Sequence, residues 1–140
     1  MIFIDTSAWI ALEDKKDINH GKAIKFKQEL VSLKKRLFTT NYILDETFTL
    51  MYSNAVESGI YTTVRFKHKI DNLIESNILV VFHIDKAIEE NAWQIFELYN
   101  RDKFWSFTDC TSKAIMDDYS ITESFTFDKH FDQMSFIRKP

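Results

Sequence analysis

Residues that interrupt helices and strands are scarce in this chain. Its 140 residues include two glycines and one proline, and the proline is the last residue. Flexible linkers, collagen-like repeats and β-sandwiches with many turns all need more of these residues. We therefore expect one domain, residues 1–140, built from long helices with short connections.

The sequence also gives no sign of disulfides or membrane spans. Cys110 is the only cysteine, which rules out an internal disulfide and agrees with a reducing compartment. We expect it to be a small buried apolar residue. No apolar run reaches the roughly 18 residues that a transmembrane helix requires, and Met1 to Asp5 lack the positive charge of a secretory signal. A soluble, cytoplasmic protein without a membrane partner is expected.

The net charge gives no overall attraction to a polyanion. The net charge is −3 at pH 7, which argues against a simple nucleic-acid coat protein. Hydrophobic residues make up 45% of the chain, which favours a folded core. Basic residues gather in three short groups that we expect to be solvated helix faces: Lys22, Lys25 and Lys27; Lys34, Lys35 and Arg36; Arg65, Lys67 and Lys69. Nucleic-acid contact would depend on such patches or on a metal ion.

Strand-like and helix-like segments alternate along the chain. Short apolar runs predict strands at residues 2–4, 37–40, 78–82 and 124–127, with an edge strand at 136–137. Helical spacing predicts a helix capped by Thr6 or Ser7, a short one beside Asp109, and helices over 21–36, 42–59, 61–76 and 85–100. The alternation indicates an α/β fold with a mostly parallel sheet covered by helices on both faces. The run 78–82 is uninterrupted, so we expect it at the centre of the sheet.

Four acidic residues fall where the carboxyl edge of this sheet is expected. Asp5 and Asp128 directly follow predicted strands, and Asp109 lies in the first turn of a predicted helix. Glu46 lies shortly after the expected helix start at Asn41. Because ligands gather beyond the carboxyl ends of strands in such folds, we expect these side chains to converge.

Each acid also has an ordinary explanation. Asp109 could be the acid of a capping box with Ser106. Asp5 and Asp128 could start turns or cap helices, as we expect of Asn41 and Asp85. Glu46 is harder to explain in this way, because its apolar neighbours imply that the carboxylate needs a partner or a metal ion.

Four converging carboxylates repel one another unless a divalent cation neutralises them. Oxygen ligands without a Cys or His pair favour Mg²⁺ or Mn²⁺ over Zn²⁺. Such an ion can activate water and stabilise charge on a phosphodiester, and two ions can act together. The pattern therefore predicts phosphodiester hydrolysis.

The segments around the four acids resemble those of PIN-domain nucleases. They are residues 1–12 (MIFIDTSAWIAL), 41–47 (NYILDET), 106–110 (SFTDC) and 126–131 (TFDKHF). The resemblance implies a three-layer α/β/α fold and a ribonuclease that depends on Mg²⁺ or Mn²⁺. A compact domain of this size is similar to the VapC-like toxins of type II toxin–antitoxin pairs, which cut a structured cellular RNA and are inhibited by a small partner protein.

The resemblance also implies a role for each matching acid. Asp5 and Asp109 would be direct metal ligands. Glu46 and Asp128 would complete the cluster or hold metal-bound water. The neighbouring Asp45 would point to another helix face and be solvated.

Hydroxyl and aromatic residues beside the acids have two explanations each. Thr6 and Ser7 would orient Asp5 or touch a phosphate, and Thr126 would support Asp128, although capping or turn hydrogen bonds explain such hydroxyls as well. We expect His130 to be a surface or packing residue, because the family pattern gives it no catalytic part. Phe104 and Trp105 could stack on a base, but we expect them in the core or in a partner-binding patch. Residues 42–66 could form a dimer face or an antitoxin groove.

Three functions fit these observations. A toxin ribonuclease should lose both cleavage and toxicity on Asp5→Asn substitution. A housekeeping PIN nuclease in RNA or DNA processing would be favoured by the lack of a small antitoxin gene next to its own. A catalytically inactive module would keep the fold and receive a basic partner in its acidic cleft. The expected partners are thus RNA, a small antitoxin and a second copy of the chain.

Overall fold

The computed structural model describes residues 1–54 and 59–140. Its strands are β1 (Ile2–Ile4), β2 (Leu37–Thr40), β3 (Leu79–Phe82), β4 (Glu123–Phe125) and β5 (Ile137–Lys139). Its helices are α1 (Thr6–Glu13), α2 (His20–Ser32), α3 (Asn41–Asn54), α4 (Gly59–Glu75), α5 (Lys86–Tyr99), α6 (Phe107–Asp118) and α7 (His130–Gln133). Strands and helices alternate as the sequence predicts.

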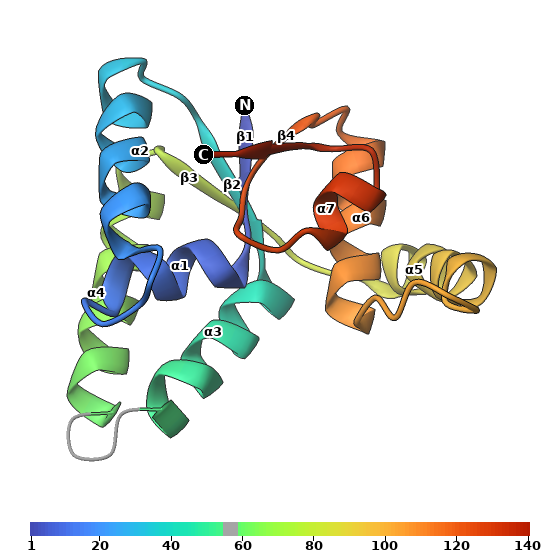
Figure 1. Ribbon diagram of the computed structural model, residues 1–140, viewed down its shortest axis with the longest axis horizontal. Coiled ribbons are helices and arrows are strands. Elements are labelled where there is room, and N and C mark those ends of the chain that lie inside the picture. The colour runs from blue at the N-terminus through green and yellow to red at the C-terminus, as the bar shows by residue number, and fades with distance from the viewer. Residues whose placement is uncertain (55–58) are drawn as a thin grey trace.

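In the described residues the strands form one sheet in the order β3-β2-β1-β4-β5, and every neighbouring pair is parallel. Helices α2 and α4 lie to one side of the strands, and α5 and α6 lie to the other (Figure 1). The predicted α/β/α architecture is therefore confirmed. A parallel arrangement brings the carboxyl ends of all strands to the same edge, which is where Asp5 and Asp128 leave the sheet.

The prediction that residues 78–82 form the central strand is wrong, because β3 is an edge strand and β1 is central. In β3 only Leu79 is buried, while Val80, Val81 and Phe82 are half-buried and pack against the core. The Phe82 ring stacks on Phe38 of β2, and Tyr119 at the end of α6 packs against it with ring centroids 4.2 Å apart. An apolar run therefore indicates that its side chains pack against the core, and it does not give the strand's place in the sheet.

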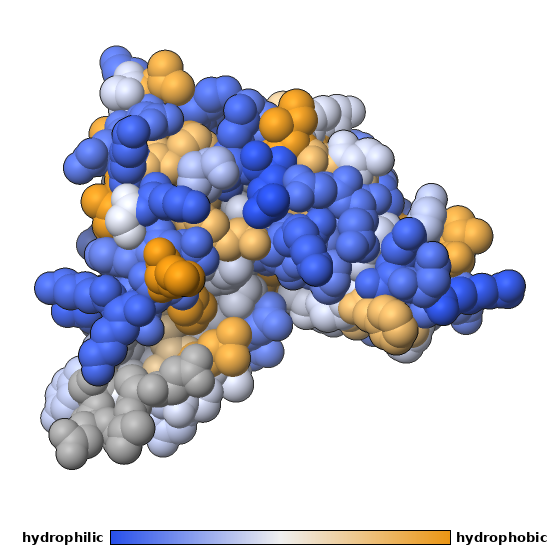
Figure 2. Space-filling model, viewed as in Figure 1, coloured by the Kyte–Doolittle hydropathy of each residue, from blue (hydrophilic) through white to orange (hydrophobic). Residues whose placement is uncertain are grey.

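The core forms around β1, whose residues Ile2, Phe3 and Ile4 are all buried. Aromatic side chains join the sheet to its helices, for example Phe125 of β4 with Phe26 of α2 at 4.9 Å between ring centroids. In the part of the chain that the structure describes, no helix is long and apolar enough to cross a membrane. The viewed surface is largely hydrophilic with scattered hydrophobic side chains (Figure 2).

Helix starts agree with the predicted caps at two places and differ at two. Asp85 caps α5, and Ser106 with Asp109 forms a capping box at α6. Helix α1 is capped by Asp5, which was the alternative explanation of this acid, and not by Thr6 or Ser7. At α3 the hydroxyl of Thr40 accepts the N–H of Ile43, while the predicted cap Asn41 accepts the N–H of Ile84 beyond β3. Asn41 thus ties the ends of β2 and β3 together.

The predicted helix over 42–59 corresponds to α3, which is described as far as Asn54. The last part of the prediction, residues 55–58, lies outside the described residues, and Gly59 begins α4. A Cβ atom at Gly59 would lie 2.5 Å from the carbonyl oxygen of Tyr52 in α3. This close approach of α3 and α4 explains why one of the chain's rare glycines stands there.

Candidate active site

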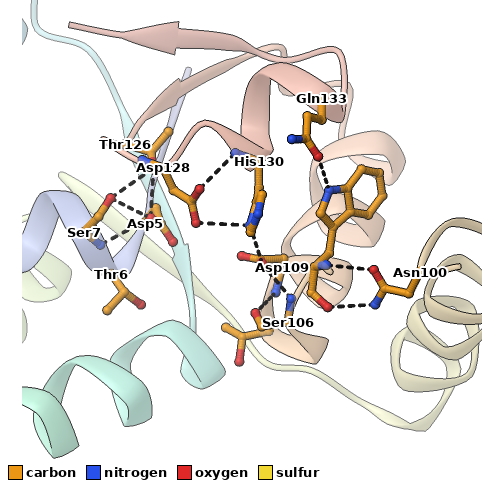
Figure 3. A network of polar contacts seen from close by, with 12 residues as sticks. Asp5, Thr6, Ser7, Asn100, Ser106, Asp109, Thr126, Asp128, His130 and Gln133 are labelled. Carbon is orange, nitrogen blue, oxygen red and sulfur yellow. Dashed lines mark hydrogen bonds and ion pairs between the residues drawn. The ribbon is translucent and has the colours of Figure 1, made fainter. Parts of the chain in front are cut away.

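Asp5 lies directly after β1 and is nearly fully buried, with 5% of its surface exposed. Its Oδ2 accepts hydrogen bonds from the Ser7 N–H (3.2 Å), the Ser7 hydroxyl (2.8 Å) and the Thr126 hydroxyl (2.9 Å), as Figure 3 shows. Burial raises the pKa of Asp5 from 3.8 to about 6, although these hydrogen bonds act in the opposite direction. Oδ2 is thus anchored, and no hydrogen bond between described residues falls on Oδ1.

Asp109 closes the capping box at the start of α6. Its Oδ2 accepts the Ser106 N–H at 2.8 Å, and the Ser106 hydroxyl accepts the Asp109 N–H at 3.0 Å. Asp109 therefore is the acid of a capping box, as its spacing from Ser106 suggested. Burial nevertheless raises the pKa of Asp109, and the charge of Asp128 adds to that increase. An acid that served only as a cap would gain nothing from being buried beside a second acid.

Thr126 joins two of the acids in the turn after β4. Its fully buried hydroxyl donates to Asp5 and accepts the N–H of Asp128 at 3.0 Å. The Ser7 hydroxyl lies 3.0 Å from the Thr126 hydroxyl and accepts the N–H of Phe127 at 2.9 Å. These bonds fix the ends of β1 and β4 against each other. Thr126 contacts Asp5 as well as the predicted partner Asp128.

Glu46 is connected to the other acids through α1. Its Oε2 accepts a hydrogen bond of 2.6 Å from the hydroxyl of Thr6, so Thr6 orients Glu46 and not Asp5. Glu46 also lines a pocket of about 420 Å³ together with Asn41, Tyr42, Asp45 and Thr108. Asp5, Asp109 and Asp128 do not line this pocket, whose one residue from α6 is Thr108. The predicted exposure of Asp45 is confirmed, and Asp45 lies at the pocket wall.

The prediction for His130 is wrong, because its side chain lies between two of the acids. Its Nδ1 is 3.4 Å from Oδ2 of Asp109 and 3.4 Å from Oδ2 of Asp128 (Figure 3). The backbone N–H of His130 donates to Oδ1 of Asp128 at 2.9 Å, which turns the ring back toward the acids. The sequence carried one signal for this arrangement: a histidine two residues after an acid at a strand end can fold back over it.

The arrangement fits a divalent cation. Asp109, Asp128 and His130 each offer one ligand atom, and these atoms lie within 4.8 Å of one another. The charge of Asp109 also raises the pKa of Asp5, which places Asp5 in the same electrostatic cluster. Within residues 1–54 and 59–140, no lysine or arginine forms an ion pair with Asp5, Glu46, Asp109 or Asp128. Buried acids without such a partner favour an external cation.

The aromatic pair before α6 divides between core and surface. Trp105 is buried, and its indole N–H donates to Gln133 of α7 at 2.9 Å. Phe104 is 82% exposed. Cys110 is buried as predicted, and burial raises the pKa of its thiol to about 11. Only Phe104 of these residues is free to contact a partner.

Comparison with known proteins identifies the family. The pattern of the PIN domain family matches residues 2–137. The "23S rRNA-specific endonuclease VapC20" of Mycobacterium tuberculosis is 30% identical over 137 residues, which cover 98% of this chain and 96% of that protein. A "VapC ribonuclease" of Archaeoglobus fulgidus is 26% identical over 129 residues, which cover 91% of this chain and 77% of that protein.

A solved structure agrees with the sequence relatives. The crystal structure of Mycobacterium tuberculosis VapC20, titled a "Sarcin-Ricin loop cleaving toxin", superposes with a TM-score of 0.78 at 30% identity. The match covers 98% of this chain and 97% of that one. Fold, sequence and relatives agree over nearly the full length, so the chain belongs to the PIN domain family and, within it, to the VapC-type ribonucleases.

Proposed function

We propose that residues 1–140 act as one PIN-type domain that cleaves RNA with Mg²⁺ or Mn²⁺ and serves as the toxin of a toxin–antitoxin pair. The observation that carries this proposal is the gathering of Asp5, Asp109 and Asp128 at the carboxyl edge of the sheet, without a lysine or arginine partner among the described residues. Such acids favour a divalent cation, and the named relatives are an endonuclease and a ribonuclease.

In this proposal some residues hold the ion and others orient the carboxylates that hold it. Asp5 and Asp109 would hold it, each anchored through Oδ2, while Asp128 and Glu46 would complete the cluster or hold water. When bound, the ion supplies an activated water and stabilises charge on the phosphodiester. Ser7 and Thr126 orient Asp5, and Thr6 orients Glu46, so the hydroxyls position carboxylates in this proposal.

The names of the relatives suggest the first substrate to test. VapC20 is named for 23S rRNA, and its structure is titled for the sarcin-ricin loop. We propose a structured ribosomal RNA as the substrate class of this chain. In this proposal the pocket lined by Glu46 and Tyr42 holds a nucleotide next to the cleaved bond.

The antitoxin would bind at α3 and α4 in this proposal. Exposed large apolar side chains on the described part of these helices are Tyr52, Ile60, Tyr61, Val64 and Ile74. An apolar surface on adjacent helices suits an amphipathic segment of a small partner protein. The same surface would also suit a second copy of the chain, so size measurement of the purified protein with and without its genetic neighbour separates the two.

Cleavage of total cellular RNA by the purified protein tests the activity. Discrete fragments should form with Mg²⁺ or Mn²⁺ and disappear with EDTA. Asp5→Asn should reduce the rate at least ~10³-fold, as expected when one member of a catalytic unit is removed. Asp118→Asn is the matched control, because Asp118 is exposed at the opposite end of the helix that carries Asp109.

Two results would contradict the proposal. Equal cleavage by the wild-type and Asp5→Asn proteins would show that the fragments come from a contaminant or from another site. No cleavage by folded protein with either ion, together with tight capture of a basic partner, would establish an inactive binding module. Toxicity on expression should follow the same pattern, being lost with Asp5→Asn and kept with Asp118→Asn.

A further inference from the structure

His130 is the one non-acidic side chain in the candidate metal group. It begins α7, and its ring is held over the site by the hydrogen bond from its backbone N–H to Oδ1 of Asp128. The side chain is 24% exposed, yet Nδ1 itself is shielded from solvent. The nitrogen therefore faces the acids and not the surrounding water (Figure 3).

Nδ1 has no hydrogen-bond partner in the described part of the chain, although two carboxylate oxygens lie nearby. Both approaches measure 3.4 Å, which is long for a charge-assisted N–H···O bond. A buried polar nitrogen without a partner is unfavourable, so a third group that satisfies it is expected. That group must also suit two carboxylates that face the same point.

The spacing of the three atoms suits ligands of one ion. Metal–ligand distances of about 2.1–2.4 Å place neighbouring octahedral ligands roughly 3.0–3.4 Å apart. The two distances of 3.4 Å from Nδ1 agree with that spacing. Because all three ligand atoms also lie within 4.8 Å of one another, one ion can reach them together.

We propose that Nδ1 of His130 is a direct ligand of the active-site ion, beside carboxylate oxygens of Asp109 and Asp128. This inference rests on the proposed metal dependence and adds a nitrogen ligand to an otherwise all-oxygen set. Mg²⁺ is bound almost entirely by oxygen, whereas first-row transition ions also accept imidazole nitrogen. The site is therefore selective for Mn²⁺ over Mg²⁺.

The first test is a pulsed electron paramagnetic resonance measurement on wild-type protein loaded with Mn²⁺. Direct imidazole ligation gives a ¹⁴N modulation of the Mn²⁺ signal, and ¹⁵N-histidine labelling should change it to the ¹⁵N pattern. A bound Mn²⁺ signal without nitrogen coupling would overturn the proposal. This measurement needs no variant, so it does not depend on how substitutions affect folding.

The second test compares His130→Gln with His68→Gln, a matched control on the exposed face of α4. Titration calorimetry should show that His130→Gln weakens Mn²⁺ binding about 10-fold or more, while Mg²⁺ binding changes much less. His68→Gln should change neither. Equal weakening of both ions by His130→Gln would mean that His130 only supports the fold of the site, and the proposal would then be wrong.

These readouts also separate this proposal from the proposed ribonuclease activity. Nitrogen-coupled Mn²⁺ in a protein that cleaves no RNA would keep His130 as a ligand and remove the nuclease. Metal-dependent cleavage by a protein whose Mn²⁺ lacks nitrogen coupling would keep the nuclease and remove His130 from the ligand set. Circular dichroism of both variants confirms that affinity is compared between folded proteins.

Discussion

The two ends of the sheet treat acidic groups in opposite ways. At the amino end, Glu123 of β4 reaches across β1 to Lys35, which precedes β2, and the two side chains form an ion pair of 3.1 Å. At the carboxyl end, the described residues give Asp5 and Asp109 hydrogen-bond donors but no lysine or arginine. The chain pairs one acid with its own lysine and leaves the others without a lysine or arginine partner among the described residues.

This difference has a cost at the carboxyl end. Burial raises the pKa of both Asp5 and Asp109, which means that the folded protein without a bound cation disfavours their charged forms. The hydroxyls of Ser7 and Thr126 lower that cost for Asp5 without removing it. An end of the sheet that binds a cation should thus be less stable by itself than the end that carries its own ion pair.

The largest stability effect is expected from Asp5→Asn in EDTA. The pKa of Asp5 is raised from 3.8 to about 6, so its stabilising contribution is complete below pH 3.8 and is lost as the pH rises through 6. That loss is about 3 kcal/mol by linkage, at 1.36 kcal/mol per pKa unit. Asn keeps the capping ability without a charge. Urea unfolding at pH 7.5 should therefore show a more stable variant, with the difference disappearing near pH 4.

Glu123→Gln is the matched control for the opposite end of the sheet. Its effect on the free energy of unfolding should stay below about 1 kcal/mol and should be destabilising.

Adding Mn²⁺ at pH 7.5 should make the wild-type protein more stable than Asp5→Asn, because the wild-type protein gains binding free energy that the variant loses. An Asp5→Asn protein that is less stable than wild type in EDTA would contradict the comparison.

A smaller effect is expected from Thr126→Val. The substitution removes a donor to the Asp5 carboxylate and the acceptor of the Asp128 N–H, which should cost about 1–3 kcal/mol. The cost should be larger at pH 7.5 than at pH 4, since the donor matters most when Asp5 is charged. Denaturant midpoints at both pH values measure this difference.

Thr39→Val provides the comparison for a neutral partner. Thr39 is also fully buried, but its hydroxyl donates to the carbonyl oxygen of Ile4. Its cost of about 1 kcal/mol should be the same at both pH values. If the two variants showed the same pH dependence, Thr126 would not support a charged Asp5.

The fold was predictable where local patterns determine it. Apolar runs and helical spacing placed the strands and the helices other than α7 within a few residues, and the capping box at Ser106 was visible from spacing alone. The place of β3 at the sheet edge was not visible, because an apolar run indicates packing against the core and does not show which strands are neighbours. The same limit applies to Asn41. Its side chain accepts a hydrogen bond from the N–H of Ile84, which follows the neighbouring strand β3, and does not cap its own helix α3.

The candidate site was also predictable only in part from the sequence. Asp5, Asp109 and Asp128 could be predicted because strand ends and helix starts of a parallel sheet share one edge. Thr6 was assigned to Asp5, yet it bonds to Glu46, since pairing of residues 40 positions apart depends on how α1 and α3 pack. His130 was missed because its place over the acids depends on a turn of two residues that composition does not reveal.

The smallest effect is expected at the amino end, where Lys35→Met removes the ion pair with Glu123. Both side chains are about one third exposed, so water and salt weaken the attraction, and a loss of about 0.5 kcal/mol is expected. In 1 M NaCl the difference from wild type should shrink, because exposed charges are screened. Urea unfolding at low and high salt measures it, with Lys86→Met as the control for a more exposed and longer pair of 3.8 Å. If Lys35→Met lowered the free energy of unfolding more than Thr126→Val does, the comparison between the two ends would be contradicted. The ion pair at the amino end would then stabilise the fold more than the Thr126 hydroxyl does at the carboxyl end.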